Sequence, residues 1–209
     1  MKFLIKKVYI ILFLLIILLS SIKVYARDSK NQYARKDISN YFLGTISANQ
    51  NYNNEAFKYL KKAQSIKNKH SQFNIQFIRT LVLLEKFKQA FTFSKSIWNE
   101  EELFFEADLL LGLNSFVEED YVSAEKYFER LNSISRYNLI FDNFVGNVLI
   151  AWVKASQGNK EESFKFLKKI PNPYHQLKRT QNIFLQCYFD VGDTQKSLEE
   201  LIDNENYNF

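Results

Sequence analysis

Few residues of this 209-residue chain have a type and spacing that could support catalysis or metal binding. The two histidines, His70 and His175, lie far apart in the sequence, each in an expected turn, so each would need unrelated partners to act as a base or a ligand. The sequence contains no phosphate-binding glycine loop, no His-Glu-x-x-His, no Gly-x-Ser-x-Gly and no Cys-x-x-Cys motif. We therefore expect surface histidines, no catalysis, and neither a cofactor nor a metal ion.

Two acidic clusters, Glu100–Glu102 and Glu118–Asp120, could be taken for calcium sites. Neither has the alternating ligands and the turn glycine of a calcium-binding loop. The first cluster lies near the start of an expected helix, where carboxylates interact favourably with the helix dipole. The second lies at the turn that enters the next helix. We interpret both clusters, and the glutamate pairs at 161–162 and 199–200, as surface carboxylates.

The single cysteine, Cys187, cannot form an intrachain disulfide. It lies in the apolar stretch 183–188, and we expect it to be a small buried hydrophobic residue. The 20 Phe and 12 Tyr residues often recur at helical spacing, which favours core packing over an aromatic binding site. With only 5 Gly, 2 Pro and no flexible linker after the leader, the chain is expected to form one domain.

Residues 1–26 have the pattern of a signal peptide. Three lysines precede an apolar run from Val8 to Leu19, and Val24-Tyr25-Ala26 provides a cleavage site after Ala26. The alternative is an uncleaved inner-membrane anchor, although the run is shorter than the roughly 20 residues that a spanning helix needs. The sequence thus predicts export to the periplasm or cell envelope, with residues 27–36 as a linker.

Charge is segregated along the chain. Removing the four basic residues of the leader from the 28 of the whole chain leaves 24 basic against 23 acidic residues, so the pI of about 9.1 does not indicate nucleic-acid binding. Residues 27–98 hold 13 basic and 4 acidic side chains, whereas residues 99–129 hold 1 and 10. We interpret this as solvated helix faces of opposite charge; the alternative is a dipolar surface that orients a charged partner.

The sequence repeats itself at a fixed interval. Ala56, Ala90 and Ala124 are each 34 residues apart, and so are Ser163 and Ser197. Between Ala124 and Ser163 the interval is 39, which indicates an insertion of five residues near positions 133–143. Apolar residues follow each of these small residues at three- to four-residue spacing, which is typical of amphipathic helices.

The period and the residues Leu43, Gly44, Ala56, Leu60 and Ala63 resemble the tetratricopeptide repeat (TPR) family. The resemblance covers about residues 37–204 and implies an all-α solenoid of about five helix-turn-helix units, or about ten helices. The expected units are about 37–70, 71–104, 105–138, 144–177 and 178–209, and residues 203–209 form a polar tail.

Small residues are expected where the two helices of a unit cross. Gly44 and Ala56 lack bulk, so the first pair of helices can approach closely. Ser163 and Ser197 replace alanine, and we expect each hydroxyl to bond locally, to the carbonyl four residues before it. The asparagines of the stretch 51–54 are expected to supply turn and N-cap chemistry.

The resemblance also implies a binding groove, because the first helix of each TPR unit lines the concave face. The positions in this sequence are Tyr41, Thr45, Asn49, Ile75, Arg79, Val82, Leu109, Leu113, Phe116, Val148, Trp152, Arg179, Asn182 and Gln186. Most are apolar, which favours a peptide segment or a partner helix; the alternative is that several pack between helices. The Lys and Asn with which some TPR domains hold a C-terminal carboxylate are replaced by Tyr41 and Thr45, so that mode of binding is not expected.

The sequence thus predicts an exported bacterial TPR scaffold or adaptor that binds protein, not nucleic acid, and that contacts a membrane only through an uncleaved leader. Its oligomeric state is left open. One alternative is the N-terminal arm of a longer assembly protein or enzyme complex, because the polar tail offers no further helix to cover the last unit. Another is a cell-wall glycan-binding module that uses Trp152 and tyrosines.

Overall fold

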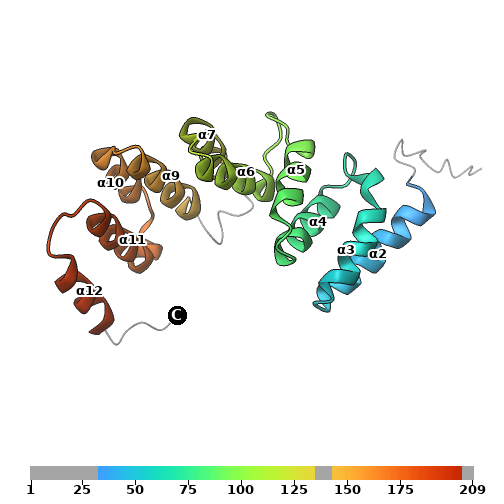
Figure 1. Ribbon diagram of the computed structural model, residues 1–209, viewed down its shortest axis with the longest axis horizontal. Coiled ribbons are helices and arrows are strands. Elements are labelled where there is room, and N and C mark those ends of the chain that lie inside the picture. Colours follow the sequence, from blue (N-terminus) through green and yellow to red (C-terminus); the bar gives the residue numbers. More distant parts are fainter. Residues whose placement is uncertain (1–32, 135–142, 204–209) are drawn as a thin grey trace, which may run out of the picture. The chain divides into compact units, whose positions relative to one another are not determined.

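The computed structural model describes residues 33–134 and 143–203, which contain ten α-helices and no strand (Figure 1). The helices are α2 (Arg35–Asn49), α3 (Asn53–Lys62), α4 (Ser71–Leu83), α5 (Phe87–Ile97), α6 (Phe105–Val117), α7 (Tyr121–Leu131), α9 (Phe144–Ser156), α10 (Lys160–Lys168), α11 (His175–Tyr188) and α12 (Thr194–Asp203). Two short 3-10 helices, η1 (Gln64–Ile66) and η2 (Asn172–Tyr174), precede α4 and α11. The expected leader, its cleavage site, most of the inserted turn and the end of the tail lie outside the described residues.

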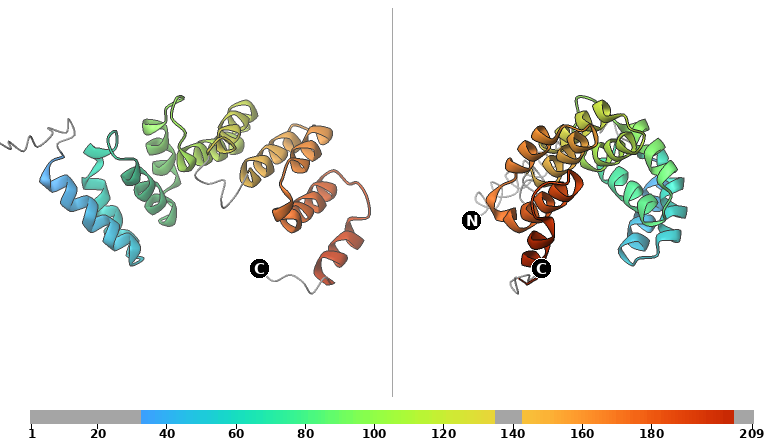
Figure 2. Two further views of the ribbon diagram at one scale, coloured as in Figure 1. Left: turned by 180° about the vertical axis from the view of Figure 1, so that it is seen from behind. Right: turned by 60° about the vertical axis from the view of Figure 1, so that its left-hand side comes forward.

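The helices pack as five consecutive pairs, as Figure 2 shows from two further sides. Within each pair the two helices contact each other. Each of the second helices, α3, α5, α7 and α10, also contacts the first helix of the next pair. First helices also touch: α2 contacts α4, α4 contacts α6, and α9 contacts α11. The predicted all-α stack of helix-turn-helix units is confirmed. The fifth pair begins at His175 rather than at 178, because η2 with Pro173 leads directly into α11.

The small residues of the repeat lie where paired helices cross, as predicted. Ala56, Ala90 and Ala124 are fully buried. A Cβ atom on Gly44 would lie 2.6 Å from Cγ of Leu60, closer than real Cβ contacts allow. Because a side chain does not fit there, α2 and α3 can approach each other only with glycine at this position.

Ser163 occupies the same position in the fourth pair, and its expected local hydrogen bond is not formed. The carbonyl of Asn159, four residues earlier, accepts the backbone N–H of Ser163 at 3.1 Å. The hydroxyl is buried at the crossing with no partner among the described residues, as is that of Ser94. The prediction of a local bond was therefore wrong: the serine packs as an alanine would and leaves a buried hydroxyl unsatisfied.

The turns within the pairs share a left-handed residue at the repeat interval. Asn51, Glu85, Glu119, Gly158 and Gly192 all have positive φ, between 57° and 76°. The N-caps are less uniform. Asp120 and Asn159 cap their helices through their side chains, whereas the N-cap of α3 is Tyr52 and makes no side-chain bond. The cap expected from the asparagines of the first turn is therefore absent.

Cys187 is exposed, so the prediction of a buried cysteine was wrong. Helix α11 buries Ile183 and Leu185. Cys187 lies one turn after the buried Ile183, but as the penultimate residue of α11 it is left exposed, as is Tyr188. The apolar stretch that suggested burial is thus only partly covered, with Phe184, Cys187 and Tyr188 exposed.

Candidate functional site

An apolar hollow with a volume of about 670 Å³ lies between α4, α5 and α6. Four of the expected groove residues line it: Arg79, Val82, Leu109 and Leu113. The other lining residues are Ile78, Leu83, Phe87, Phe91, Glu106, Leu110 and Val117. The hollow is of a size that accommodates large apolar side chains of a ligand.

A second, smaller hollow of about 190 Å³ adjoins it along α6. Its walls are Leu113, Phe116 and Phe128, with Leu149 and Trp152 from α9. Leu113 lines both hollows, so the two adjoin at this side chain. We call these two hollows together the apolar groove. Six of the groove residues expected from the sequence line it: Arg79, Val82, Leu109, Leu113, Phe116 and Trp152.

Arg79 does not bring an uncompensated charge to the groove. Its guanidinium donates to Oε1 of Glu106 at 3.0 Å, which joins the first helices α4 and α6. The side chain of Arg79 is 55% exposed and that of Glu106 only 8% exposed. Because Glu106 is buried, its carboxylate would be destabilising without a charged partner, and Arg79 supplies that partner. The groove is therefore apolar, with one ion pair on its wall.

Trp152 is oriented by the next helix pair. Its indole N–H donates to Oε1 of Gln181 at 2.9 Å, and its ring meets that of Tyr188 edge to face, with centroids 5.8 Å apart. Trp152 is half-buried, so it is not wholly internal. The ring packs against α11 on one side and lines the smaller hollow with Leu113 and Phe116 on the other.

The structure places the remaining expected groove residues elsewhere. Tyr41 packs against His70 and Phe73, with ring centroids 4.7 and 6.2 Å away. Ile75 is only 4% exposed and is an interior residue. Arg179 pairs with Glu200 of α12 at 3.3 Å. The rest are half-buried or exposed outside the two hollows: Thr45, Asn49, Val148, Asn182 and Gln186.

Sequence reasoning missed the contribution of a second helix to the groove. Phe87 and Phe91, both on α5, form part of the wall of the larger hollow. Their spacing of four residues places them on one helix face, and Phe87 is 47% exposed. This spacing was the available signal. It was not used because the resemblance assigns the groove to first helices alone.

The histidines differ in their surroundings. His70 is the N-cap of α4, where its Nδ1 accepts the backbone N–H of Phe73 at 3.1 Å. Its ring is also half-buried against Tyr41, so it is a structural rather than a free surface residue. His175 is exposed, as predicted.

A buried carboxylate fixes the segment that carries the first acidic cluster. Asp108 accepts the indole N–H of Trp98 and Nε of Arg130, each at 2.8 Å, and the backbone N–H of Phe104 at 3.2 Å. Asp108 is fully buried, and Arg130 is 12% exposed at its side chain. This network connects α5, α6 and α7 through one set of charge-assisted bonds, which are stronger than neutral ones.

The acidic clusters behave as surface groups with local partners. Lys126 donates to the Glu100 carboxylate at 2.6 Å and holds the pKa of Glu100 below its usual value. Hydrogen bonds from Ser123 lower the pKa of Asp120, which is the N-cap of α7. Across residues 33–134 and 143–203, no group of three His, Cys, Asp or Glu side chains is arranged to hold a metal ion. No helix in these same ranges is both long enough and apolar enough to span a membrane.

Comparison with known proteins identifies the class of fold. No protein-family model and no curated protein match this chain. Among solved structures, MamA (residues 41 to end) from Desulfovibrio magneticus RS-1 superposes with a TM-score of 0.63, at 15% identity, over 84% of this chain and 99% of that one. YrrB, described as a TPR protein with an unusual peptide-binding site, gives a TM-score of 0.61 at 14% identity, over 83% and 90% of the two chains.

A third structure, the type IV pilus biogenesis factor PilW, matches with a TM-score of 0.59 at 15% identity, over 82% of this chain and 79% of PilW. A TPR protein from Parabacteroides merdae matches at 17% identity with a TM-score of 0.62, over 79% and 64% of the two chains. The fold of this chain is thus that of the TPR proteins, as the 34-residue period predicted.

Proposed function

We propose that this chain is a non-catalytic scaffold that binds an apolar peptide segment or a partner helix in the apolar groove. The observation that carries the proposal is that two apolar hollows adjoin at Leu113, with walls from α4, α5, α6, α7 and α9. Apolar grooves between helices accept helices through side chains spaced three to four residues apart, which would enter neighbouring hollows. The fold shared with YrrB, a protein described by its peptide-binding site, supports this mode.

We further propose that the protein works in the cell envelope. The support is the signal-like pattern of residues 1–26 and a fold shared with PilW, a pilus biogenesis factor. N-terminal sequencing of the protein recovered from the envelope fraction tests this. We expect Arg27 as the first residue; Met1 would instead favour the uncleaved anchor.

Leu113→Glu tests the groove because Leu113 lines both hollows. A carboxylate there would be placed against apolar walls, so we expect the protein to lose the partners that the wild type retains in affinity capture. Val122→Glu is the matched control, since Val122 is 78% exposed on α7 and lines neither hollow. Equal capture by the two variants would contradict the proposal.

A second measurement separates lost binding from lost folding. A photo-reactive amino acid at position 113 should cross-link to the captured partner, whereas the same group at position 122 should not. Cross-links from position 122 alone would place the partner on a different surface and contradict binding in the apolar groove.

A further inference from the structure

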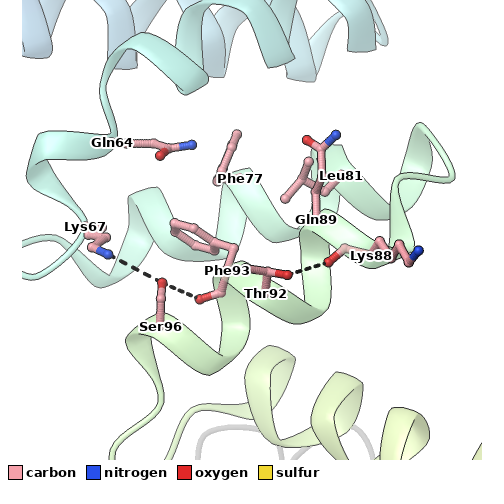
Figure 3. Close-up of a pocket in the computed structure, with 9 residues that line it drawn as sticks. All are labelled: Gln64, Lys67, Phe77, Leu81, Lys88, Gln89, Thr92, Phe93 and Ser96. Carbon is pink, nitrogen blue, oxygen red and sulfur yellow. Dashed lines mark hydrogen bonds between the residues drawn. The ribbon is translucent and has the colours of Figure 1, made fainter.

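A second hollow, outside the apolar groove, has a basic rim. Its volume is about 500 Å³, and it lies between η1, α4 and α5. We call it the basic hollow. Figure 3 shows Lys67 and Lys88 at its two ends, with Phe77 and Phe93 between them. Gln64 and Thr92 add polar groups to the rim. An aromatic floor between two ammonium groups suits a ligand that combines carboxylates with an apolar side chain.

The two rim lysines have no carboxylate partner in the part of the chain that the structure describes. Lys67 donates only to Oγ of Ser96, at 3.4 Å, and Lys88 makes no ion pair. By contrast, Lys126 and Lys154 each hold a glutamate at 2.6 Å. No carboxylate among the described residues therefore compensates the positive charge of the basic hollow, which is available to an acidic partner.

Two more lysines increase the positive potential beside the hollow. Phe57 stacks on Phe77 with ring centroids 6.1 Å apart, and Lys61 and Lys86 lie over the ring of Phe57 at 5.7 and 5.3 Å. Neither lysine has a carboxylate partner in the described ranges. Clustered like charges raise the local potential and attract oppositely charged groups.

The complementary chemistry is present on this chain, in the loop Asn99–Leu103 between α5 and α6, which we call the acidic loop. Arg130 donates to the backbone carbonyls of Asn99, Glu100 and Glu102 at 3.0, 2.6 and 2.7 Å. The side chains of Glu101 and Glu102 are exposed, and Leu103 is 40% exposed. A loop whose backbone is already held in one conformation, here by Arg130, loses little entropy when it binds.

We propose that the acidic loop of one copy docks in the basic hollow of a second copy, with Glu101 and Glu102 at the lysines and Leu103 over the aromatic floor. Arg130 and Lys126 hold the acidic loop against α7 of its own copy. Loop and hollow are different surfaces, and such a heterologous contact extends from copy to copy unless it closes into a ring. The apolar groove takes no part in this contact.

The first test uses a fluorescent peptide of residues 99–105, Asn-Glu-Glu-Glu-Leu-Phe-Phe, and measures its anisotropy with the whole protein. We expect saturable binding that weakens at high salt, because it depends on exposed charges. K67A/K88A should weaken binding by about tenfold, which corresponds to the loss of two exposed ion pairs. K58A/K95A removes two exposed lysines outside the hollow and should leave the affinity within about twofold of the wild type.

The second test is sedimentation velocity over a range of protein concentrations. The wild type should associate progressively, whereas K67A/K88A and E101A/E102A should each remain monomeric. Their 1:1 mixture should form a dimer and nothing larger, because only one intact loop and one intact hollow can meet. E129A/E161A, which changes two exposed glutamates elsewhere, should associate as the wild type does.

Three outcomes would overturn the proposal. One is a wild-type protein that stays monomeric at all concentrations while the peptide fails to bind. Another is equal weakening by the two lysine pairs, which would show a general charge effect without a site. The third is a mixture of the hollow and loop variants that remains monomeric although each variant has the melting temperature of the wild type.

Discussion

At the scale of single residues, the fold depends on side-chain volume at the helix crossings. Leu60 fills the space that a side chain on Gly44 would need, and Phe128 does the same at Gly112 in the third pair. Ala56 and Ala124 are fully buried one turn before these large residues. Close packing makes such positions sensitive to a single added methylene. The small residues of the repeat thus set how closely the two helices of a pair approach each other.

Ala90→Leu should overpack the crossing of α4 and α5, because Ala90 has no exposed surface. We expect a loss of about 1–3 kcal/mol in the free energy of unfolding, measured by denaturant titration. Gln89→Leu, at an exposed neighbouring position, is the control and should change stability by less than about 0.5 kcal/mol. A wild-type stability for Ala90→Leu would show that the crossing is not where the period places it.

Trp152→Ala should weaken partner capture, because the ring lines the smaller hollow. Buried aromatic anchors typically contribute about 2 kcal/mol or more to binding, which is roughly thirtyfold in affinity. Tyr188→Ala removes the same ring contact from the opposite side without altering the hollow. Both variants should melt at a lower temperature, and only Trp152→Ala should lose the partner. Loss of capture in both would reduce Trp152 to a packing residue.

At the scale of helices and turns, two structural features determine where helices end and how neighbouring helices are connected. One is the residue with positive φ in each turn, which in the second and third pairs is a glutamate rather than a glycine. Left-handed backbone at a residue with a Cβ atom is unfavourable by roughly 1–2 kcal/mol. The turns of these two pairs therefore contain local strain that those at Gly158 and Gly192 lack.

Glu119→Gly should relieve this strain and stabilise the protein by about 1 kcal/mol, which a higher melting temperature would show. Glu118→Gly is the adjacent control: its φ is −80°, so glycine there adds only unfolded-state entropy. That variant should be destabilised by about 0.5–1 kcal/mol. If both glycine substitutions shift the melting temperature in the same direction, the prediction is wrong.

The second feature is the buried network of Asp108, Arg130 and Trp98 that connects α5, α6 and α7. Asp108→Ala leaves Arg130 without its carboxylate, and we expect a loss of about 3–5 kcal/mol in chemical denaturation. Glu100→Ala breaks the exposed pair with Lys126 and should leave the melting temperature nearly unchanged. Similar melting temperatures for the two variants would mean that burial adds nothing to this network.

At the scale of the whole molecule, packing is uneven along the stack. The described core cluster that begins on α7 extends through α9 and α10 to Leu185 of α11. None of the residues 194–202 of α12 is buried, and Ile202 is 77% exposed. In stacked repeats each unit contacts only its neighbours, so stability is approximately a sum of local terms. We therefore expect the last pair to be the least stable part that the structure describes.

Hydrogen exchange should reveal this gradient. Amides of α12 should exchange fastest, those of α11 at an intermediate rate, and those of α4–α7 slowest, because opening free energies follow local burial. Ala90→Leu provides an internal control, since it should accelerate exchange in α4 and α5 more than in α12. Uniform exchange across all helices would instead indicate one cooperative unit.

Much of the fold could be predicted from the sequence, but only part of the candidate site. Six expected groove residues do line the apolar groove, because the helical face of a residue follows from its position in the repeat. Ile75 shares that pattern and is nevertheless interior, since burial depends on which neighbour covers the face. Phe87 and Phe91 were missed because they reach the groove from a second helix.

The sequence by itself determined the all-α class, the five pairs and the small residues at their crossings. These features depend on residue volume and periodicity, which are local properties of the chain. The tertiary structure alone decided that Arg79 is neutralised by Glu106, that Asp108 joins three helices, and that Cys187 is exposed. Each of these depends on side chains brought together by the packing of helices, or on a face that no helix covers, and no spacing along the sequence records that.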